Sequence, residues 1–146
     1  MFRGQFQHSL DIKGRVVIPV KFREGIGDVF FITRTKEKCL LAYTEEEWSQ
    51  IEKTASELPM TDPEVKKYIR MFIGNVAEVE PDAQGRIVIP QNLRDHAGLI
   101  KDIIYVGMAN HIEIWSKEEW DSQFAEDEPD DQSQTEKMVR YGFRWA

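Results

Sequence analysis

The chain has 146 residues, of which 41% are hydrophobic, and a formal net charge of −7. This length allows one domain or two very small ones, and the hydrophobic content is that of a globular protein. No apolar run reaches the roughly 18 residues of a membrane span, and the N-terminus lacks a secretory signal pattern. Cys39 is the single cysteine, which excludes an internal disulfide, so we expect a cytoplasmic protein.

The first half of the chain begins with a series of strand patterns. Short apolar and β-branched runs bounded by Gly, Pro and charged residues are typical of β-strands. The expected strands are residues 5–10, 16–18, 29–33 and 39–43. Pro19 ends the second strand, and a short helical turn should follow it until Gly25 or Gly27.

Two helices are expected after the fourth strand. Thr44 and Glu47 form a capping box, in which each side chain can satisfy a backbone N–H of the other residue. Pro59 ends that helix, and Asp62 caps a second one that has Pro63 in its first position. Both helices carry apolar residues on one face.

The chain then repeats itself. Residues 11–19 (Asp-Ile-Lys-Gly-Arg-Val-Val-Ile-Pro) return as residues 82–90 (Asp-Ala-Gln-Gly-Arg-Ile-Val-Ile-Pro), an offset of 71 residues. The match continues through residues 103–106 and 112–120, with small gaps. A unit of about 45 residues rarely folds alone. We therefore expect the two copies to pack together about a pseudo-twofold axis.

These patterns divide the chain into four segments. They are a first repeat at 1–58, a connecting helix at 59–75, a second repeat at 76–124, and an acidic linker with an apolar tail at 125–146. The linker, residues 126–134, is expected to be mobile. The aromatic tail and the helix faces around Trp48 and Tyr68 are the expected subunit contacts, because exposed apolar patches mark such surfaces.

The repeated motif is Asp-x-x-Gly-Arg followed by a β-branched run and Pro. Asp at the first turn position can accept backbone N–H bonds, and Gly relieves the strain of a positive φ. A structural role in the turns is therefore assigned to Asp11, Gly14, Asp82 and Gly85. The following arginine can bind guanine or a phosphate through two parallel hydrogen bonds. In the alternative interpretation, Arg15 only pairs with Asp11 and closes the turn.

The charge is unevenly distributed. Residues 117–136 contribute −8, whereas residues 1–23 carry a local charge of +4. Local charge steers ligands more than the total does, although solvated surface alone would also explain these charges. Lys13 adds a point charge to the first turn, while Gln84 in the second can pair with adenine but supplies none. Duplex DNA suits a doubled basic motif, since the duplex itself is symmetric or repetitive.

Patterns of catalytic residues are weak. His8, His96 and His111 are scattered, and we find no metal-ligand spacing, nucleophile elbow or phosphate-binding glycine loop. We expect no enzymatic activity, cofactor, metal or small-molecule substrate.

Three blocks resemble the MraZ family of bacterial transcriptional regulators, over nearly the whole chain up to about Phe124. They are Met1-Phe2-Arg3-Gly4, Leu10-Asp11-x-Lys13-Gly14-Arg15-x-x-Ile18-Pro19 and Asp82-x-x-Gly85-Arg86. The resemblance implies an α+β, mainly β fold: a pseudo-twofold, swapped-hairpin β-barrel of two SpoVT-AbrB-type repeats with flanking helices.

The same resemblance implies a function. It implies a ring-shaped homo-oligomer, associated with the nucleoid, that represses its own division and cell-wall gene cluster by binding short direct repeats in the promoter. The DNA-contacting candidates are Arg3, Lys13, Arg15, Gln84 and Arg86.

Two alternatives remain open, because fold alone does not decide function. One is an AbrB-like antitoxin whose acidic tail blocks a toxin. The other is a ring-forming assembly protein that binds a protein partner. An antitoxin usually has one motif copy and a long tail, so two copies and a short tail favour the regulator.

Overall fold

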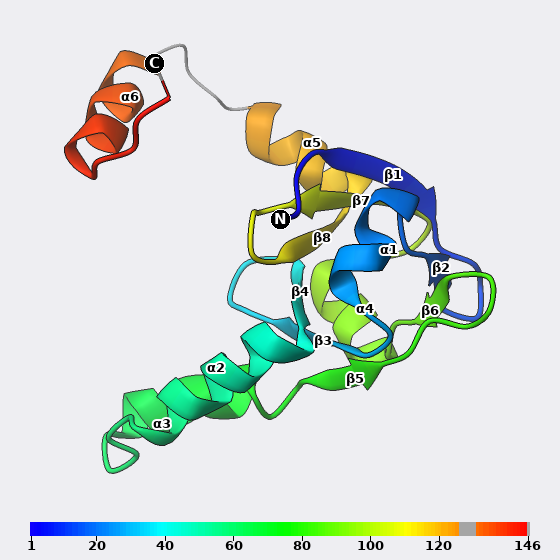
Figure 1. Ribbon diagram of the computed structural model, residues 1–146, viewed down its shortest axis with the longest axis horizontal. Helices are drawn as coiled ribbons and strands as arrows, with labels where there is room; N and C mark the ends of the chain where they lie inside the picture. The colour runs from blue at the N-terminus through cyan, green and yellow to red at the C-terminus, as the bar shows by residue number, and fades with distance from the viewer. Residues whose placement is uncertain (126–130, 146) are drawn as a thin grey trace.

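The computed structural model describes residues 1–125 and 131–145. These residues form eight strands and six helices, which confirms the mixed α+β class (Figure 1). The elements are β1 (Gln5–Ser9), β2 (Arg15–Val17), α1 (Val20–Ile26), β3 (Phe30–Arg34), β4 (Leu40–Thr44), α2 (Glu45–Ser56), α3 (Pro63–Phe72), β5 (Ala77–Val79), β6 (Arg86–Val88), α4 (Gln91–Ala97), β7 (Asp102–Gly107), β8 (Ile112–Ser116), α5 (Lys117–Ala125) and α6 (Asp131–Arg140). Residues 126–130 of the expected linker lie outside the described residues, and its remainder begins α6.

Six strands form one antiparallel sheet in the order β1-β7-β8-β4-β3-β5, and β2 pairs with β6 in a separate ribbon. The expectation of a closed barrel is wrong for this sheet. Its edge strands β1 and β5 do not pair with each other. The strands β2 and β6, each of three residues, pair together and do not bridge these edges.

The two repeats contribute strands to each other's part of the sheet. β1 of the first repeat pairs with β7 of the second, where Phe6 lies opposite Tyr105. In the same way, β5 of the second repeat pairs with β3 of the first, where Ile32 lies opposite Ala77. Each repeat therefore completes a hydrogen-bonded edge that the other repeat leaves open.

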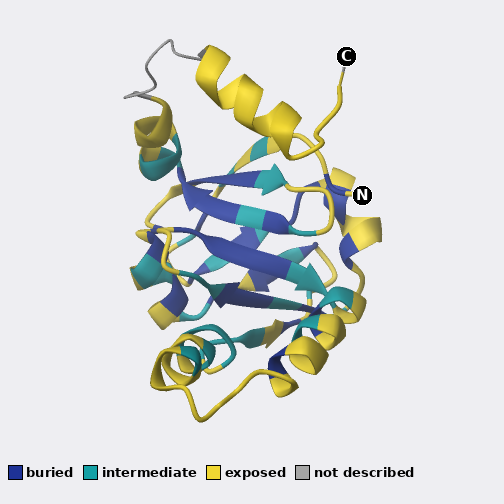
Figure 2. Ribbon diagram, turned by 90° about the vertical axis from the view of Figure 1, so that its left-hand side faces the viewer, coloured by how far each residue is buried: buried dark blue, intermediate teal, exposed yellow. Residues whose placement is uncertain are grey.

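The main core lies between the sheet, the ribbon and the two short helices α1 and α4. Phe22 of α1 and Leu93 of α4 are fully buried there. A second cluster around Leu41 and Trp115 lies on the opposite face of the sheet, because successive side chains of a strand alternate between faces. Figure 2 shows the buried residues concentrated in the strands, while the outer surfaces of the helices are exposed.

Thr44 and Asp62 cap their helices as the sequence patterns predict, although only one of the two capping-box bonds between Thr44 and Glu47 occurs among the described residues. Thr44 Oγ1 accepts the N–H of Glu47 at 3.1 Å, and Asp62 Oδ1 accepts the N–H of Glu64 at 2.9 Å. These bonds satisfy donors that the first turn of a helix leaves without partners. None of the helices in the described residues combines the length and apolar character that crossing a bilayer requires.

Trp48 of α2 belongs to the interior of its own chain, so the Trp48 side chain is not available to another subunit. The residue is only 2% exposed, and its ring stacks on Phe31 and Phe72 of the same chain. Thr33 also donates a hydrogen bond to the carbonyl of Phe72, which holds α3 against β3. α6, in contrast, stands apart from the sheet in Figure 1.

Candidate nucleic-acid interface

The first copy of the repeated motif folds into a hydrogen-bonded turn. Asp11 Oδ1 accepts the backbone N–H of Lys13 at 2.9 Å and of Arg15 at 2.8 Å. The N–H of Gly14 donates to the carbonyl of Asp11 at 3.0 Å, and Gly14 has a φ of +80°. The backbone bond from Arg15 is the largest of the causes that lower the pKa of the Asp11 carboxyl.

The second copy repeats this geometry. Asp82 Oδ1 accepts the backbone N–H groups of Gln84 and Arg86, both at 2.9 Å. Gly85 donates to the carbonyl of Asp82 at 2.9 Å and has a φ of +76°. The backbone bond from Arg86 lowers the pKa of the Asp82 carboxyl in turn. Both turns therefore have the same aspartate hydrogen bonds and a glycine with a positive φ at the same position.

Each motif arginine is held by the aspartate of its own turn. Nε of Arg15 donates to Asp11 Oδ2 at 2.7 Å, and Nε of Arg86 donates to Asp82 Oδ2 at 2.8 Å. The ion pair of the alternative interpretation is thus present in both copies. It engages only Nε, so the terminal Nη1 and Nη2 groups of the half-exposed guanidinium are left to bind a planar acceptor such as a phosphate or a base edge.

The β2–β6 ribbon places the two motif arginines on one surface. Arg15 lies opposite Val88, and Arg86 lies opposite Val17. Because side chains alternate along a strand, these four residues share one face of the ribbon. Val88 on this face is 56% exposed. Each turn leads into its strand, so the two turns lie at opposite ends of this antiparallel ribbon. The tip of the first turn carries Lys13, and the tip of the second carries Gln84.

Arg3 lies elsewhere. Its neighbour Phe2 pairs with Ala109, and Gly107 donates to the carbonyl of Gly4 at 2.8 Å. The whole of β1 separates Arg3 from the turn at Asp11, and a strand of that length spans about 17 Å. The structure therefore brings four of the five candidate residues to the ribbon and leaves Arg3 at the far end of β1.

Two further arginines lie at the turns without having been assigned from the sequence. The guanidinium of Arg94 lies against Gly14, and that of Arg23 lies against Gly85. Arg23 and Arg94 are 71 residues apart, the same offset as the two motif copies. This spacing was the one feature of the sequence that could have pointed to them. Sequence spacing could not reveal that each arginine contacts the turn of the other repeat.

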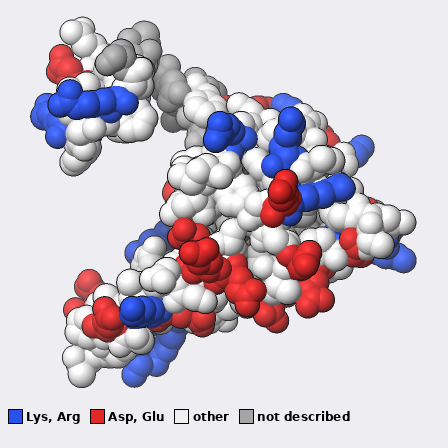
Figure 3. Space-filling model, viewed as in Figure 1, with Lys and Arg blue, Asp and Glu red and all other residues white. Residues whose placement is uncertain are grey.

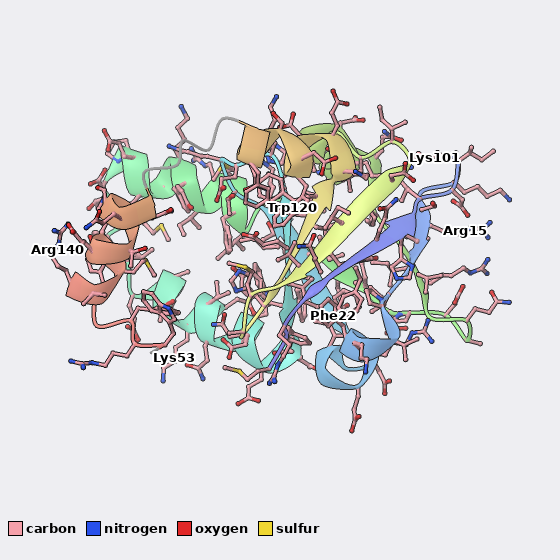
Figure 4. The ribbon with its side chains drawn as sticks, turned by 90° about the horizontal axis from the view of Figure 1, so that it is seen from above. Arg15, Phe22, Lys53, Lys101, Trp120 and Arg140 are labelled. Atoms are coloured by element: carbon pink, nitrogen blue, oxygen red, sulfur yellow. The ribbon has the colours of Figure 1, made fainter. Side chains whose placement is uncertain are left out.

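The surroundings of the ribbon are partly basic. Arg15 and Lys101 lie at the same end of the molecule in Figure 4, and the carbonyl of Lys101 accepts the N–H of Leu10 at 2.7 Å. In Figure 3, acidic side chains gather along the lower side of the main body, while basic side chains lie on its upper side. Within the described residues, no three His, Cys, Asp or Glu side chains lie close enough to hold a metal ion.

Comparison with known proteins follows the same division into two copies. A family model described as "MraZ protein, putative antitoxin-like" matches residues 1–70 and again residues 71–141. The chain belongs to the MraZ family. The protein named "Transcriptional regulator MraZ" from Acetivibrio thermocellus is 48% identical over 142 residues, which cover 97% of this chain and 99% of that protein. The resemblance seen in the sequence is thereby confirmed.

The family match also relates the helices of the two repeats. Each matched segment holds one motif turn and three helices in the same order: a short helix after the motif strand (α1 or α4), a capped helix after the last strand (α2 or α5), and one further helix (α3 or α6). α6 in the second segment is therefore the counterpart of α3 in the first.

Proposed function

We propose that this chain is a transcriptional regulator that binds double-stranded DNA through the β2–β6 ribbon and its two turns. The observation that carries the proposal is the placement of Arg15 and Arg86 on one face of the ribbon, each pairing with the aspartate of its own turn through Nε. The major groove of B-form DNA admits a two-stranded ribbon, and arginine is the commonest reader of guanine there. The name of the 48% identical relative supports the same function.

In its finer form, the proposal is a repressor of the chain's own division and cell-wall gene cluster, working in the cytoplasm on the nucleoid. Its target is a set of short direct repeats in the promoter. Lys13 and Gln84 stand beside the arginines, so they are the next candidates for base or phosphate contacts. Arg3 would have to reach DNA from the far end of β1, and its contribution to the interface should be the smallest.

We further propose a homo-oligomer, arranged as a ring. One subunit offers few cations at the ribbon, and tight binding at physiological salt requires many phosphate contacts. Several subunits side by side would multiply the contacts through effective concentration. Tyr141 and Trp145 of the tail are 79% and 57% exposed, and Tyr68 of α3 is 44% exposed. These aromatic rings are the proposed subunit contacts.

The proposed domain organisation follows the repeats. Residues 1–58 and 76–124 are the two SpoVT-AbrB-type units, 59–75 connects them, and 125–146 is the acidic linker and tail. The pairing of β1 with β7 and of β5 with β3 supports exchanged hairpins between the units.

An antitoxin is the second candidate, because the matching family model carries the description antitoxin-like. A gel shift separates the candidates. The regulator should shift DNA from upstream of its own gene and leave random DNA of equal length unshifted. A pure assembly protein should shift neither, and an antitoxin should additionally bind a toxin protein.

The oligomer is tested separately. Light scattering at micromolar concentration should give a mass several times that of the 17.1 kDa chain, and a clean monomer mass would refute the ring. Footprinting should show protection across several repeats. Protection of a single half-site, unchanged when neighbouring repeats are deleted, would show that subunits bind independently.

A further inference from the structure

Two equivalent arginines reach the turn of the opposite repeat. A Cβ atom placed on Gly14 would lie 2.5 Å from Nη1 and 2.6 Å from Cζ of Arg94. A Cβ atom on Gly85 would lie 2.6 Å from Cζ of Arg23. Gly98 also has a positive φ, yet, apart from its chain neighbours, none of the described residues places an atom within 4 Å of its Cβ position. The guanidinium contact is therefore a feature of the two motif turns and not of every left-handed glycine.

Each of these arginines is held in place by its own helix region. Nε of Arg23 donates to the carbonyl of Ile18 at 3.0 Å, and Nη2 of Arg94 donates to Gln91 Oε1 at 2.8 Å. Nε of Arg94 is enclosed and has no hydrogen-bond partner in the structure. Both guanidinium groups are thus oriented before any ligand arrives, which reduces the entropy lost on binding.

The backbone couples the same elements. Ile18 donates to the carbonyl of Gly85 at 2.8 Å, and Ile89 donates to the carbonyl of Gly14 at 2.9 Å. Each turn is consequently fixed by the residues that lead into the short helix of the other repeat.

These arginines differ from the motif arginines in that neither forms a direct ion pair in the part of the chain that the structure describes. Among the described residues, neither Arg23 nor Arg94 forms an ion pair, whereas the motif arginines are paired with the aspartates of their turns. Arg94 therefore joins Lys13 and Arg15 at the first turn and makes it more basic.

Arg23 adds a positive charge to the second turn, but carboxylates lie around it. Arg23 lines a cavity of about 460 Å³ together with Asp28, Glu80 and Asp82. These carboxylates offset part of the charge that Arg23 supplies. The first turn remains the more basic of the two.

We propose that Arg23 and Arg94 are positioning residues for DNA, each of which holds the turn of the opposite repeat and binds a DNA phosphate beside it. The inference rests on the proposed DNA-binding function. Phosphate contacts set the register of a protein on the duplex, while base contacts carry the sequence preference. Each half of the interface is then composite, with a motif turn from one repeat and a phosphate-binding arginine from the other.

Salt dependence tests the phosphate contact. Full-length wild type and Arg94→Gln are titrated with a fluorescent duplex from upstream of the chain's own gene at several salt concentrations. Each phosphate contact contributes about 0.9 to the slope of log affinity against log salt. Arg94→Gln should lower the slope by about that amount per bound subunit and weaken binding on the order of tenfold. Arg23→Gln should have a smaller effect, because carboxylates surround it.

The control removes the same charge elsewhere. Lys53 is exposed on α2 and lies far from Arg15 in Figure 4, so Lys53→Gln should leave affinity and slope unchanged. Arg94→Lys keeps the charge but loses the planar group against Gly14. It should retain the salt slope and lose part of the preference for the upstream DNA over random DNA.

A double-mutant cycle tests the cross-repeat arrangement. Arg94→Gln should be non-additive with Arg15→Ala, whose turn it contacts, and additive with Arg86→Ala in its own repeat. The reverse pattern, or an unchanged affinity and slope for Arg94→Gln, would overturn the proposal. Thermal melting verifies that each variant is folded. If Arg94→Gln does not fold, the test is whether Arg94→Lys loses part of the preference for the upstream DNA over random DNA, and an unchanged preference would overturn the proposal. If wild type itself fails to bind the DNA, both the proposed function and this inference are wrong. That result is distinguishable from the outcomes that overturn the inference alone, because in those wild type still binds.

Discussion

Val16 and Ile87 hold the same position in the two repeats, and each is the other's cross-strand partner in the β2–β6 ribbon. Both are buried, at 2% and 1% exposure. A pair of equivalent residues that face each other places the pseudo-twofold axis between them. Arg15 and Arg86 each lie one residue from this pair, so the same axis relates the two arginines.

This pair should be important for stability. Ile87→Ala should destabilise the fold by about 2–5 kcal/mol, because it removes buried methyl groups and leaves a cavity. Denaturant unfolding measures the change. Val88→Ala is the matched control on the exposed face of the same strand, and should cost no more than about 0.5 kcal/mol. If the two variants lost equal free energy of unfolding, the assignment of Ile87 to the buried face and Val88 to the exposed face would be wrong.

The two motif arginines should contribute unequally to DNA binding. Arg15→Ala should cost about 1–3 kcal/mol per subunit if the guanidinium makes a bidentate base contact. Arg86→Ala should cost less, because Gln84 stands where the first turn has Lys13. Fluorescence titration with the upstream DNA measures both. If Arg15→Ala bound the DNA with wild-type affinity, Arg15 would not be part of the interface.

Substituting the motif glycines should damage the fold more than DNA contacts. Valine at φ of +80° in Gly14→Val or +76° in Gly85→Val is strained, at about 1–2 kcal/mol for the left-handed backbone alone, and the new side chain must also displace a guanidinium. Gly98→Val separates these effects, since its φ is +66° and, apart from its chain neighbours, no described residue places an atom within 4 Å of its Cβ position. Thermal melting should rank both motif variants below Gly98→Val. Motif variants that melt like wild type would contradict the turn geometry.

Acid should weaken both turns. The folded-state pKa of Asp11 and of Asp82 is lowered, chiefly by the backbone N–H of the following arginine. The stabilisation is therefore fully present above the ordinary Asp pKa of about 3.9, and is lost as pH falls through the lowered pKa. NMR titration of the carboxyl groups should find both midpoints below that ordinary value. A normal midpoint at either residue would mean that its turn bonds do not persist in solution.

Cys39 should be chemically inert in the folded chain. Burial, with smaller effects from Glu113 and Glu37, raises the pKa of its thiol to about 12. Because the thiolate is the reactive form, iodoacetamide at about pH 8 should label it on the order of a hundredfold more slowly than in the unfolded chain. Mass spectrometry after timed labelling gives both rates. Rapid labelling without denaturant would show that this part of the sheet opens.

The tertiary structure decided the features that depend on contacts between distant residues. It separated Arg3 from the turns, buried Trp48 under α3, and left the sheet open where a closed barrel was expected. It also placed Arg23 and Arg94 at the turns of the opposite repeats. None of these follows from spacing, because each depends on which strands pair and which helices pack together.

The sequence by itself determined the features whose interactions are local. The turns are built from hydrogen bonds between Asp11 and residues no more than four positions away, so the motif alone was enough to predict them. The cap at Thr44 spans three residues and could be predicted for the same reason. The doubled motif by itself predicted two equivalent halves. The sequence did not determine how the two halves pack together, because that depends on which distant strands pair. The strand pairing in turn decides which turn each of Arg23 and Arg94 contacts.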